Sequence, residues 1–236
     1  MGSSVMRTFA GVAAFSASVL FVPSFVDAAG SPKQTLASVL ATARAQQSVH
    51  YVAASTIGTV RTRLVCDVGL TEGSQQITFT QGKKSGKVTV LVSAGTAYIR
   101  GDAFTLTTYL GFKQAGATKV AGQWVQIPHG DRSYASTAEA VTLSSTIDEL
   151  RLNGPLTLLP ASTVAGQKVV GIRGKTVAKP PAAGIVYVST QPKPLPVGQI
   201  ETIGGGLAEM LFSHWNEQVH AAVPANPVAI ATTGLE

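Results

Sequence analysis

The stretch between residues 86 and 128 constrains the fold more than any other part of the chain. It begins with an alternating run at residues 87–92, turns at Gly95 and returns through residues 96–100. Successive side chains of a strand point to opposite faces, so this alternation predicts a hairpin with one apolar face. The next segment is too apolar for a loop, and residues 122–128 alternate again. The order predicted here is therefore sheet, apolar lid and sheet.

Similar alternating segments lie on both sides of this stretch. They cover residues 49–57, 59–69 and 76–80 before it, and 167–173, 184–189, 195–203 and 207–213 after it. Gly204, Gly205 and Gly206 form a predicted hairpin turn. The alternating prolines Pro192, Pro194 and Pro196 restrict their stretch to an edge strand or a connection. Strands joined by short turns, with one polar face, indicate an antiparallel sheet solvated on one side.

Helical signals interrupt the strands at three places. Ser31 and Pro32 begin a capping-box helix that ends near Gln47. Asp102 is a predicted N-cap for the apolar lid, residues 104–112, and a polar loop follows the lid. Two further capping-box patterns, at Ser136 and Thr146, predict a helical insert over residues 137–152, as one kinked helix or two short ones.

These elements together predict the fold class. A sheet of about nine strands twists and curls, and its apolar face needs a cover. Only the first helix, the lid and the helical insert are available for that purpose. We therefore expect an α+β protein, mainly antiparallel β, in which a curled sheet holds helices in its concavity. A lid over a curved sheet also creates a concave apolar site.

Composition excludes several classes of protein. Of the 236 residues 45% are hydrophobic and only 13% charged, which indicates one folded domain rather than a disordered chain. The net charge is +6, but the basic clusters are small: Lys83 and Lys84 with Lys87, and Arg61 with Arg63. Nucleic-acid binding requires a denser basic stripe with interleaved aromatic residues, so no nucleic-acid partner is predicted. Anionic lipid headgroups suit this charge better.

Residues 1–28 have the pattern of a cleaved signal peptide. Arg7 precedes an apolar run at residues 9–22, and small residues precede Ala29. The run is shorter than the roughly 20 residues of a spanning helix, although an uncleaved N-terminal anchor is the alternative. We expect export to the periplasm, cell envelope or extracellular space. With no cysteine near the cleavage site, lipid anchoring is not expected. Residues 29–224 then form the domain, and residues 225–236 a flexible tail with little to pack.

No pattern of catalytic or metal-binding residues is present in the sequence. Cys66 lies on the apolar face of a predicted strand, where it is a buried hydrophobe or, alternatively, a reactive thiol. The four histidines lack metal-ligand spacing, and no serine lies in a Gly-x-Ser-x-Gly motif. Gly174-Lys175-Thr176 fails as a phosphate-binding loop because position 169 is valine. We therefore predict neither an enzyme nor a metal or cofactor site.

The motifs resemble those of a known family. The segments are residues 97–101, the lid, residues 122–128, Pro192–Pro196 and the run Leu211-Phe212-Ser213-His214-Trp215-Asn216-Glu217-Gln218-Val219. Their order is similar to that of the LppX/LprG-type envelope lipoproteins of the LolA/LolB-like superfamily, over residues 32–224. The resemblance implies a half-open β-barrel whose apolar cavity holds the acyl chains of lipids, glycolipids or lipoproteins. It also implies transient contact with a membrane or with membrane proteins. The lipidated cysteine of such lipoproteins is missing here, so a freely diffusing carrier is expected.

The predicted cavity is lined by apolar residues of the three covering segments. They are Leu36, Val39 and Leu40 from the first helix, Phe104, Tyr109 and Leu110 from the lid, and Val141, Ile147 and Leu150 from the insert. The alternative is an interaction or sensor module of the same fold, in which these side chains fill the concavity and leave no room for a ligand.

Overall fold

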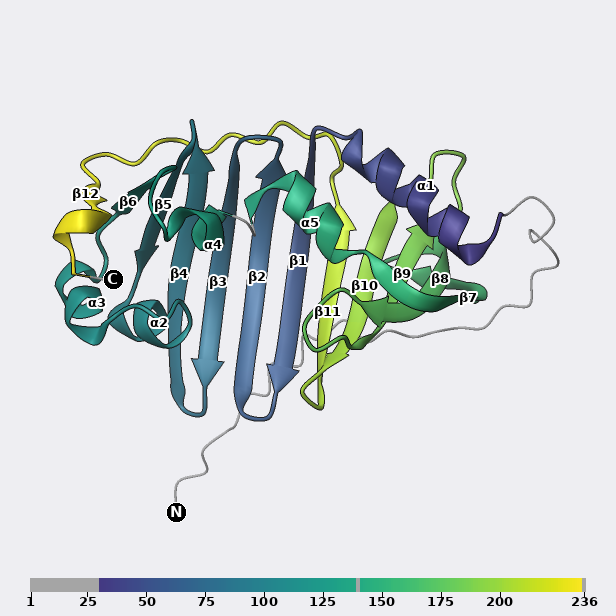
Figure 1. Cartoon of the computed structure of the whole chain (residues 1–236), viewed down its shortest axis with the longest axis horizontal. Coiled ribbons are helices and arrows are strands. Elements are labelled where there is room, and N and C mark those ends of the chain that lie inside the picture. Colours follow the sequence, from purple (N-terminus) through teal and green to yellow (C-terminus); the bar gives the residue numbers. More distant parts are fainter. Residues whose placement is uncertain (1–29, 139–140, 235–236) are drawn as a thin grey trace, which may run out of the picture.

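The computed structural model describes residues 30–138 and 141–234, and its main feature is a curled sheet of twelve strands (Figure 1). The predicted signal peptide, residues 1–28, lies outside the described residues. The strand order is β12-β6-β5-β4-β3-β2-β1-β11-β10-β9-β8-β7. The edge strands β12 and β7 do not pair with each other, so the sheet stays unclosed. The predicted class, a curled and mainly antiparallel half-barrel, is confirmed.

The strand bounds are β1 (Ser48–Ile57), β2 (Val60–Gly69), β3 (Gly73–Gln81), β4 (Lys84–Ser93), β5 (Thr96–Gly101), β6 (Val125–Pro128), β7 (Leu152–Val164), β8 (Gln167–Thr176), β9 (Ala183–Ser189), β10 (Pro196–Ile203), β11 (Gly206–Ser213) and β12 (Val228–Ala229). All neighbours are antiparallel except β12 and β6, which are parallel. Strand β1 pairs with both β2 and β11, so the two halves of the sequence meet at the centre of the sheet.

The helices lie on one face of the sheet (Figure 1). They are α1 (Pro32–Arg44), α2 (Ala103–Thr108), α3 (Gln114–Val120), α4 (Tyr134–Ala138) and α5 (Leu143–Glu149), with a short 3-10 helix, η3 (Ile230–Thr232). Helix α1 begins with the predicted capping box at Ser31, and Asp102 caps α2 as predicted. No helix among the described residues is both long and apolar enough to cross a membrane.

The space between sheet and helices contains two separate apolar cores. The first core lies under α1 and α5: Leu36, Val39, Leu40, Ala43, Val49, Tyr51, Cys66, Val68, Leu143, Ile147, Leu150, Leu152, Ile172, Val186, Val188 and Phe212. The second core lies under α2, α3 and α4: Ile77, Val88, Val90, Val92, Ala97, Ile99, Leu106, Ala117, Val120, Val125, Ile127, Ala138, Val141 and Ile230. Leu64 packs against both cores, so it marks the place where they meet.

The helical segments differ from the prediction in three places. The expected polar loop after the lid is helix α3, which buries Gly116, Ala117 and Val120 against the second core. Helix α4 begins at Tyr134 and not after a cap at Ser136. Helix α5 begins at Leu143, with Thr142 as its N-cap residue, so the predicted capping box at Thr146 is wrong.

The early start of α5 has a clear physical reason. It places Leu143, Ile147 and Leu150 at helical spacing on one stripe, and all three are buried in the first core. A helix that began after Thr146 would leave Leu143 outside this stripe. Burial of the stripe therefore outweighs the local capping preference. Of the two forms expected for the insert, the structure has two short helices, α4 and α5.

Strand β7 was not predicted, although it is the longest strand described. Its sequence contains Gly154, Pro155 and Pro160, which argue against a strand in the middle of a sheet. The strand lies at the edge and pairs only with β8, with register shifts between Asn153 and Thr157 and between Leu158 and Ala161. One unpaired side and two irregularities accommodate prolines that an interior strand would not.

The C-terminal segment also differs from expectation. Residues 228–229 form β12 beside β6, and η3 follows directly. Ile230 is buried in the second core, and the Thr233 side chain donates to the Ile230 carbonyl at 2.6 Å. The expectation of little packing beyond residue 224 is therefore wrong for residues 228–233. Burial of the Ile230 side chain in the second core holds this segment against the domain.

Candidate functional site

The concave face of the sheet is organised in rows of side chains that cross the strands. The uppermost row contains Val49, Val68, Gly73, Val92, Ala97 and Ile127, and the second row contains Phe212, Tyr51, Cys66, Gln75, Val90 and Ile99. Every member of both rows is buried. These two upper rows therefore form a dry floor under the helices.

The third row changes character at the centre of the sheet. Met210, Ala53 and Leu64 are direct cross-strand neighbours on β11, β1 and β2, and each is only partly buried. We call these three residues the open row. On the β3 side the row continues into Ile77 and Val88, which are fully buried. The open row is thus an apolar strip, three strands wide, that the helices do not cover completely.

The fourth row is more polar. It contains Glu201, Ala208, Ser55 and Thr62, followed by the buried Phe79. Partial burial raises the pKa of the Glu201 carboxyl above its ordinary value. Burial on the concave face therefore decreases from the two upper rows to the open row, and the fourth row below it is more polar.

The arrangement of the helices explains this gradient. In Figure 1, α5 crosses the upper parts of β1 and β2, and α2 lies in front of the lower part of β4. The lower parts of β1 and β2 have no helix in front of them in this view. All three residues of the open row pack against the first core, and Leu64 also packs against the second.

A polar group lies buried where the two cores meet. Gln75 of the second row stands between Cys66 of the first core and Val90 of the second. Its Nε2 has no hydrogen-bond partner among the described residues, which costs about 1–3 kcal/mol for a buried amide. Burial raises the pKa of the Cys66 thiol to about 11, with neighbouring Tyr51 and Gln75 partly offsetting the rise. Cys66 is therefore an unreactive thiol in this state of the protein.

The residues that the sequence assigned to one cavity are divided between the two cores. Leu36, Val39, Leu40, Ile147 and Leu150 belong to the first core, and Val141 belongs to the second. Tyr109 and Leu110 pack against the second core and are half-buried. Phe104 stacks on Phe79, with ring centroids 5.8 Å apart. The structure thus brings these side chains into contact with the sheet in two groups.

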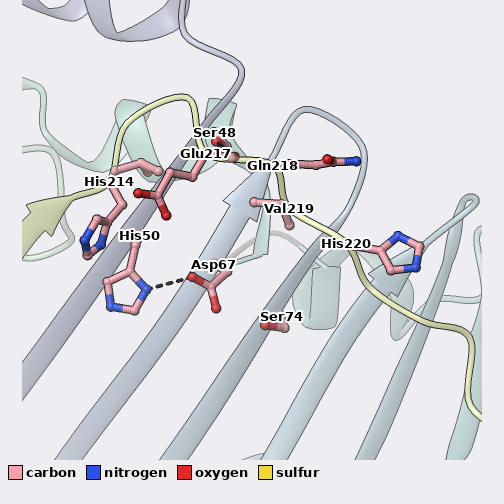
Figure 2. A pocket seen from close by; sticks show the side chains of 10 residues that line it. Ser48, His50, Asp67, Ser74, His214, Glu217, Gln218, Val219 and His220 are labelled. Atoms are coloured by element: carbon pink, nitrogen blue, oxygen red, sulfur yellow. Dashed lines mark hydrogen bonds and ion pairs between the residues drawn. The ribbon is translucent and has the colours of Figure 1, made fainter.

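Two pockets formed by the described residues lie away from the helices, at the upper edge of the sheet. One has a volume of about 340 Å³ and is lined by polar side chains that include His50, Asp67 and His214 (Figure 2). The other, of about 420 Å³, lies beside it under residues 216–219. None of the nine predicted cavity residues lines either pocket.

The histidine pair in the first pocket neither activates a nucleophile nor forms part of a metal-binding group among the described residues. His50 Nδ1 lies 2.7 Å from an Asp67 carboxylate oxygen, and the His50 and His214 rings meet edge to face at 5.7 Å (Figure 2). The Ser48 hydroxyl donates to the Glu217 carbonyl and is not held by His50. Within residues 30–138 and 141–234, no group of three potential ligands could hold a metal ion. A polar surface pocket is what this geometry supports.

Sequence reasoning missed the open row for a specific reason. Ala53 and Leu64 follow the alternation of their strands, but that alternation only assigns them to a face. Their adjacency to Met210 depends on the pairing of β1 with β11, which joins distant parts of the chain. Only register shows that the three residues form one strip.

Comparison with known proteins identifies the fold. No protein-family model and no curated protein sequence matches the chain. Among solved structures, LprF from Mycobacterium bovis aligns with a TM-score of 0.54 at 14% identity, over 83% of this chain and 97% of LprF. The lipoprotein LppX from Mycobacterium tuberculosis aligns with a TM-score of 0.51 at 17% identity, over 80% of this chain and 99% of LppX. The chain therefore has the fold of the LppX/LprG-type proteins, and the resemblance found in the sequence is confirmed at that level.

Proposed function

We propose that this protein binds the acyl chains of lipids, glycolipids or lipoproteins on the concave face of its sheet and carries them within the cell envelope. The observation that carries the proposal is the open row. Met210, Ala53 and Leu64 form a continuous apolar strip that is only partly buried where the two cores meet. An extended hydrocarbon chain needs such a strip and no catalytic group, because burial stabilises it by about 0.8 kcal/mol per methylene. The likeness to LppX and LprF supports the proposal through the fold alone.

Binding would begin at the open row and extend upward. Leu64 contacts both cores, so a chain lying on it would separate the α5 cover from the α2 cover. The nine residues that the sequence proposed for the cavity would then line the opened space from both sides. The free Gln75 Nε2 lies one row above, where it could donate to an ester or carboxyl oxygen of the bound lipid. Such a partner would remove the cost of the unsatisfied amide.

The test is uptake of a soluble fluorescent fatty-acyl probe by the purified protein. Leu64→Gln should weaken probe binding about tenfold, since it removes roughly half of the burial of one leucine. Val65→Gln is the matched control, because Val65 is the next residue of β2, is also partly buried, and points to the opposite face. Equal affinities for both variants, or no uptake by the parent protein, would exclude the open row as an acyl site.

The second candidate function is an interaction or sensor module with a filled core. One observation favours it: Val39, Ile147 and Leu150 are fully buried against the strands. Mass spectrometry of protein purified under native conditions from its own host distinguishes the two. Co-purifying acyl species support the carrier, whereas their absence together with no probe uptake supports the module. Export of the protein is part of the first proposal and is supported by the apolar run at residues 9–22.

A further inference from the structure

Three hairpins end together at the lower edge of the sheet. They connect β1 to β2, β3 to β4 and β10 to β11, and their turns lie side by side along the bottom of Figure 1. The β1–β2 and β10–β11 turns are in contact range, because a methyl group placed on Gly204 would lie 3.4 Å from Ile57. We call residues 57–63, 81–87 and 202–208 the hairpin edge.

Large apolar side chains are exposed on the hairpin edge. Ile57 is 37% exposed and Leu207 is 45% exposed, and Leu207 pairs with Thr56 next to Ile57. The two side chains therefore stand on neighbouring strands at the end of the sheet, Ile57 on the concave face and Leu207 on the opposite face. Ile203 and Val60 beside them are partly exposed. The turns themselves contain mainly glycine, so nothing in them covers these side chains.

The hairpin edge is also basic. It contains Arg61, Arg63, Lys83, Lys84 and Lys87, all exposed, and no aspartate or glutamate. Asp102 borders it, but its carboxylate accepts hydrogen bonds from the backbone N–H groups of Lys87 and Thr105. At the opposite edge the pockets are lined by Asp67, Glu72 and Glu217. The hairpin edge is therefore locally basic, with Glu201 and Glu209 directly flanking its third segment.

We propose that the hairpin edge docks on an anionic lipid bilayer. Exposed Ile57 and Leu207 would enter the headgroup region, while the five basic side chains around them contact lipid phosphates. With the hairpin edge facing the bilayer, the strands would run across the membrane plane. The long lysine side chains on these turns can reach separate lipid phosphates. The three turns do not form the continuous surface that a protein partner would need. A lipid phosphate surface is thus the occupant that both the charge and the exposed apolar residues fit.

This inference extends the proposed function, because it names the surface by which a lipid carrier would reach its lipid. In the docked orientation the fourth row lies between the bilayer and the open row. A chain leaving the membrane would then meet Thr62 and Ser55 of the fourth row before it reaches Leu64. Docking can nevertheless be measured without any acyl binding. The two proposals therefore fail separately.

The experiment is flotation of the purified protein with vesicles. One set contains phosphatidylcholine alone, and the other contains equal amounts of phosphatidylcholine and phosphatidylglycerol. We expect binding to the anionic vesicles, reduced by added salt, and little binding to the neutral ones. Lys83→Gln with Lys84→Gln should weaken binding by about fivefold for each charge removed. The matched control is Lys168→Gln with Lys193→Gln, which removes the same charge from two exposed positions at the opposite end of the sheet.

The apolar contribution is tested in the same assay. Ile57→Asp with Leu207→Asp should reduce vesicle binding at least tenfold. Leu70→Asp with Val223→Asp is the control, because these residues are similarly exposed, at 55% and 57%, but lie away from the hairpin edge. Uptake of the soluble acyl probe should be unchanged in all four variants. Equal vesicle binding by the edge and control variants, or no preference for anionic vesicles, would overturn the docking proposal and leave the acyl site intact.

Discussion

The upper and lower rows of the concave face belong to the same strands but differ in burial. The two upper rows are buried beneath α1, α5 and the helices of the second core. The open row and the fourth row belong to the same strands, one and two steps further along, yet they are only partly buried at the centre of the sheet. Stability should therefore depend more on the upper rows than on the lower ones.

The largest expected effect comes from removing a side chain above the upper rows. Ile147→Ala should lower the free energy of unfolding by about 3 kcal/mol, because Ile147 is fully buried between α5 and the first core. Leu64→Ala in the open row should cost only about 1 kcal/mol, since part of that side chain already contacts water. Urea unfolding followed by circular dichroism measures both. Similar losses for the two variants would mean that the two halves of the face do not differ in packing.

Helix α2 covers part of the second core, and the contribution of its N-terminal cap can be measured separately. Asp102 accepts hydrogen bonds from the Thr105 N–H at 2.8 Å and the Lys87 N–H at 2.6 Å. Asp102→Ala should therefore destabilise the protein by about 1–2 kcal/mol. Asp67→Ala, which removes an exposed carboxylate paired with His50, should change stability by less than about 0.5 kcal/mol. The two variants are compared by urea unfolding at neutral pH.

The pH dependence of the same cap gives an independent measurement. Burial alone would raise the pKa of Asp102, but hydrogen bonds from Thr105 and Lys87 hold it below its ordinary value of 3.8. A carboxyl whose pKa is lowered on folding contributes its full stabilisation above the unfolded value and loses it as the pH falls through the folded value. The difference between parent and Asp102→Ala should thus be constant above about pH 5 and shrink below pH 3.8. A difference that does not change with pH would mean that ionisation of Asp102 contributes nothing.

The sequence predicted the repetitive parts of this structure and missed the parts set by register and edges. Alternation located β1 to β6 and β8 to β11, because one face of each strand is apolar and the other is solvated. It missed β7, where Pro155 and Pro160 are tolerated only because the strand lies at the edge. Helix α3 was missed because its buried face consists of small residues, Gly116 and Ala117, with only Val120 as a large one.

The candidate site was less predictable than the fold. Amphipathic spacing correctly selected residues that face the sheet, such as Leu36 and Ile147, but spacing does not distinguish a packed core from a ligand site. The open row depends on the alignment of β11 with β1 and of β1 with β2. The hairpin edge likewise depends on three turns meeting at one end of the sheet. The register of strands that are distant in the sequence therefore decides which residues form the candidate site.

The last predicted effect is a gain in stability, and it concerns Gln75, which lies between the two cores. Gln75 lies in the second row, directly between the two cores, and its Nε2 is buried without a partner. Replacing it with an apolar residue of similar size should remove the desolvation cost, so Gln75→Leu should stabilise the protein by about 1 kcal/mol. Gln76→Leu, at the neighbouring exposed position on the other face, should change stability by less than about 0.5 kcal/mol.

The same variant separates a stability role from a binding role. If Gln75 Nε2 serves a lipid carbonyl, Gln75→Leu should bind a fatty-acid methyl ester about tenfold more weakly than the parent protein while binding a plain hydrocarbon equally well. Probe displacement by the two ligands measures this difference, and Gln76→Leu should leave both affinities unchanged. Loss of stability in Gln75→Leu would mean that the amide is satisfied in the folded protein. In that case Gln75 would stabilise the packing between the two cores, and separating the cores would cost more free energy than their packing at Leu64 indicates.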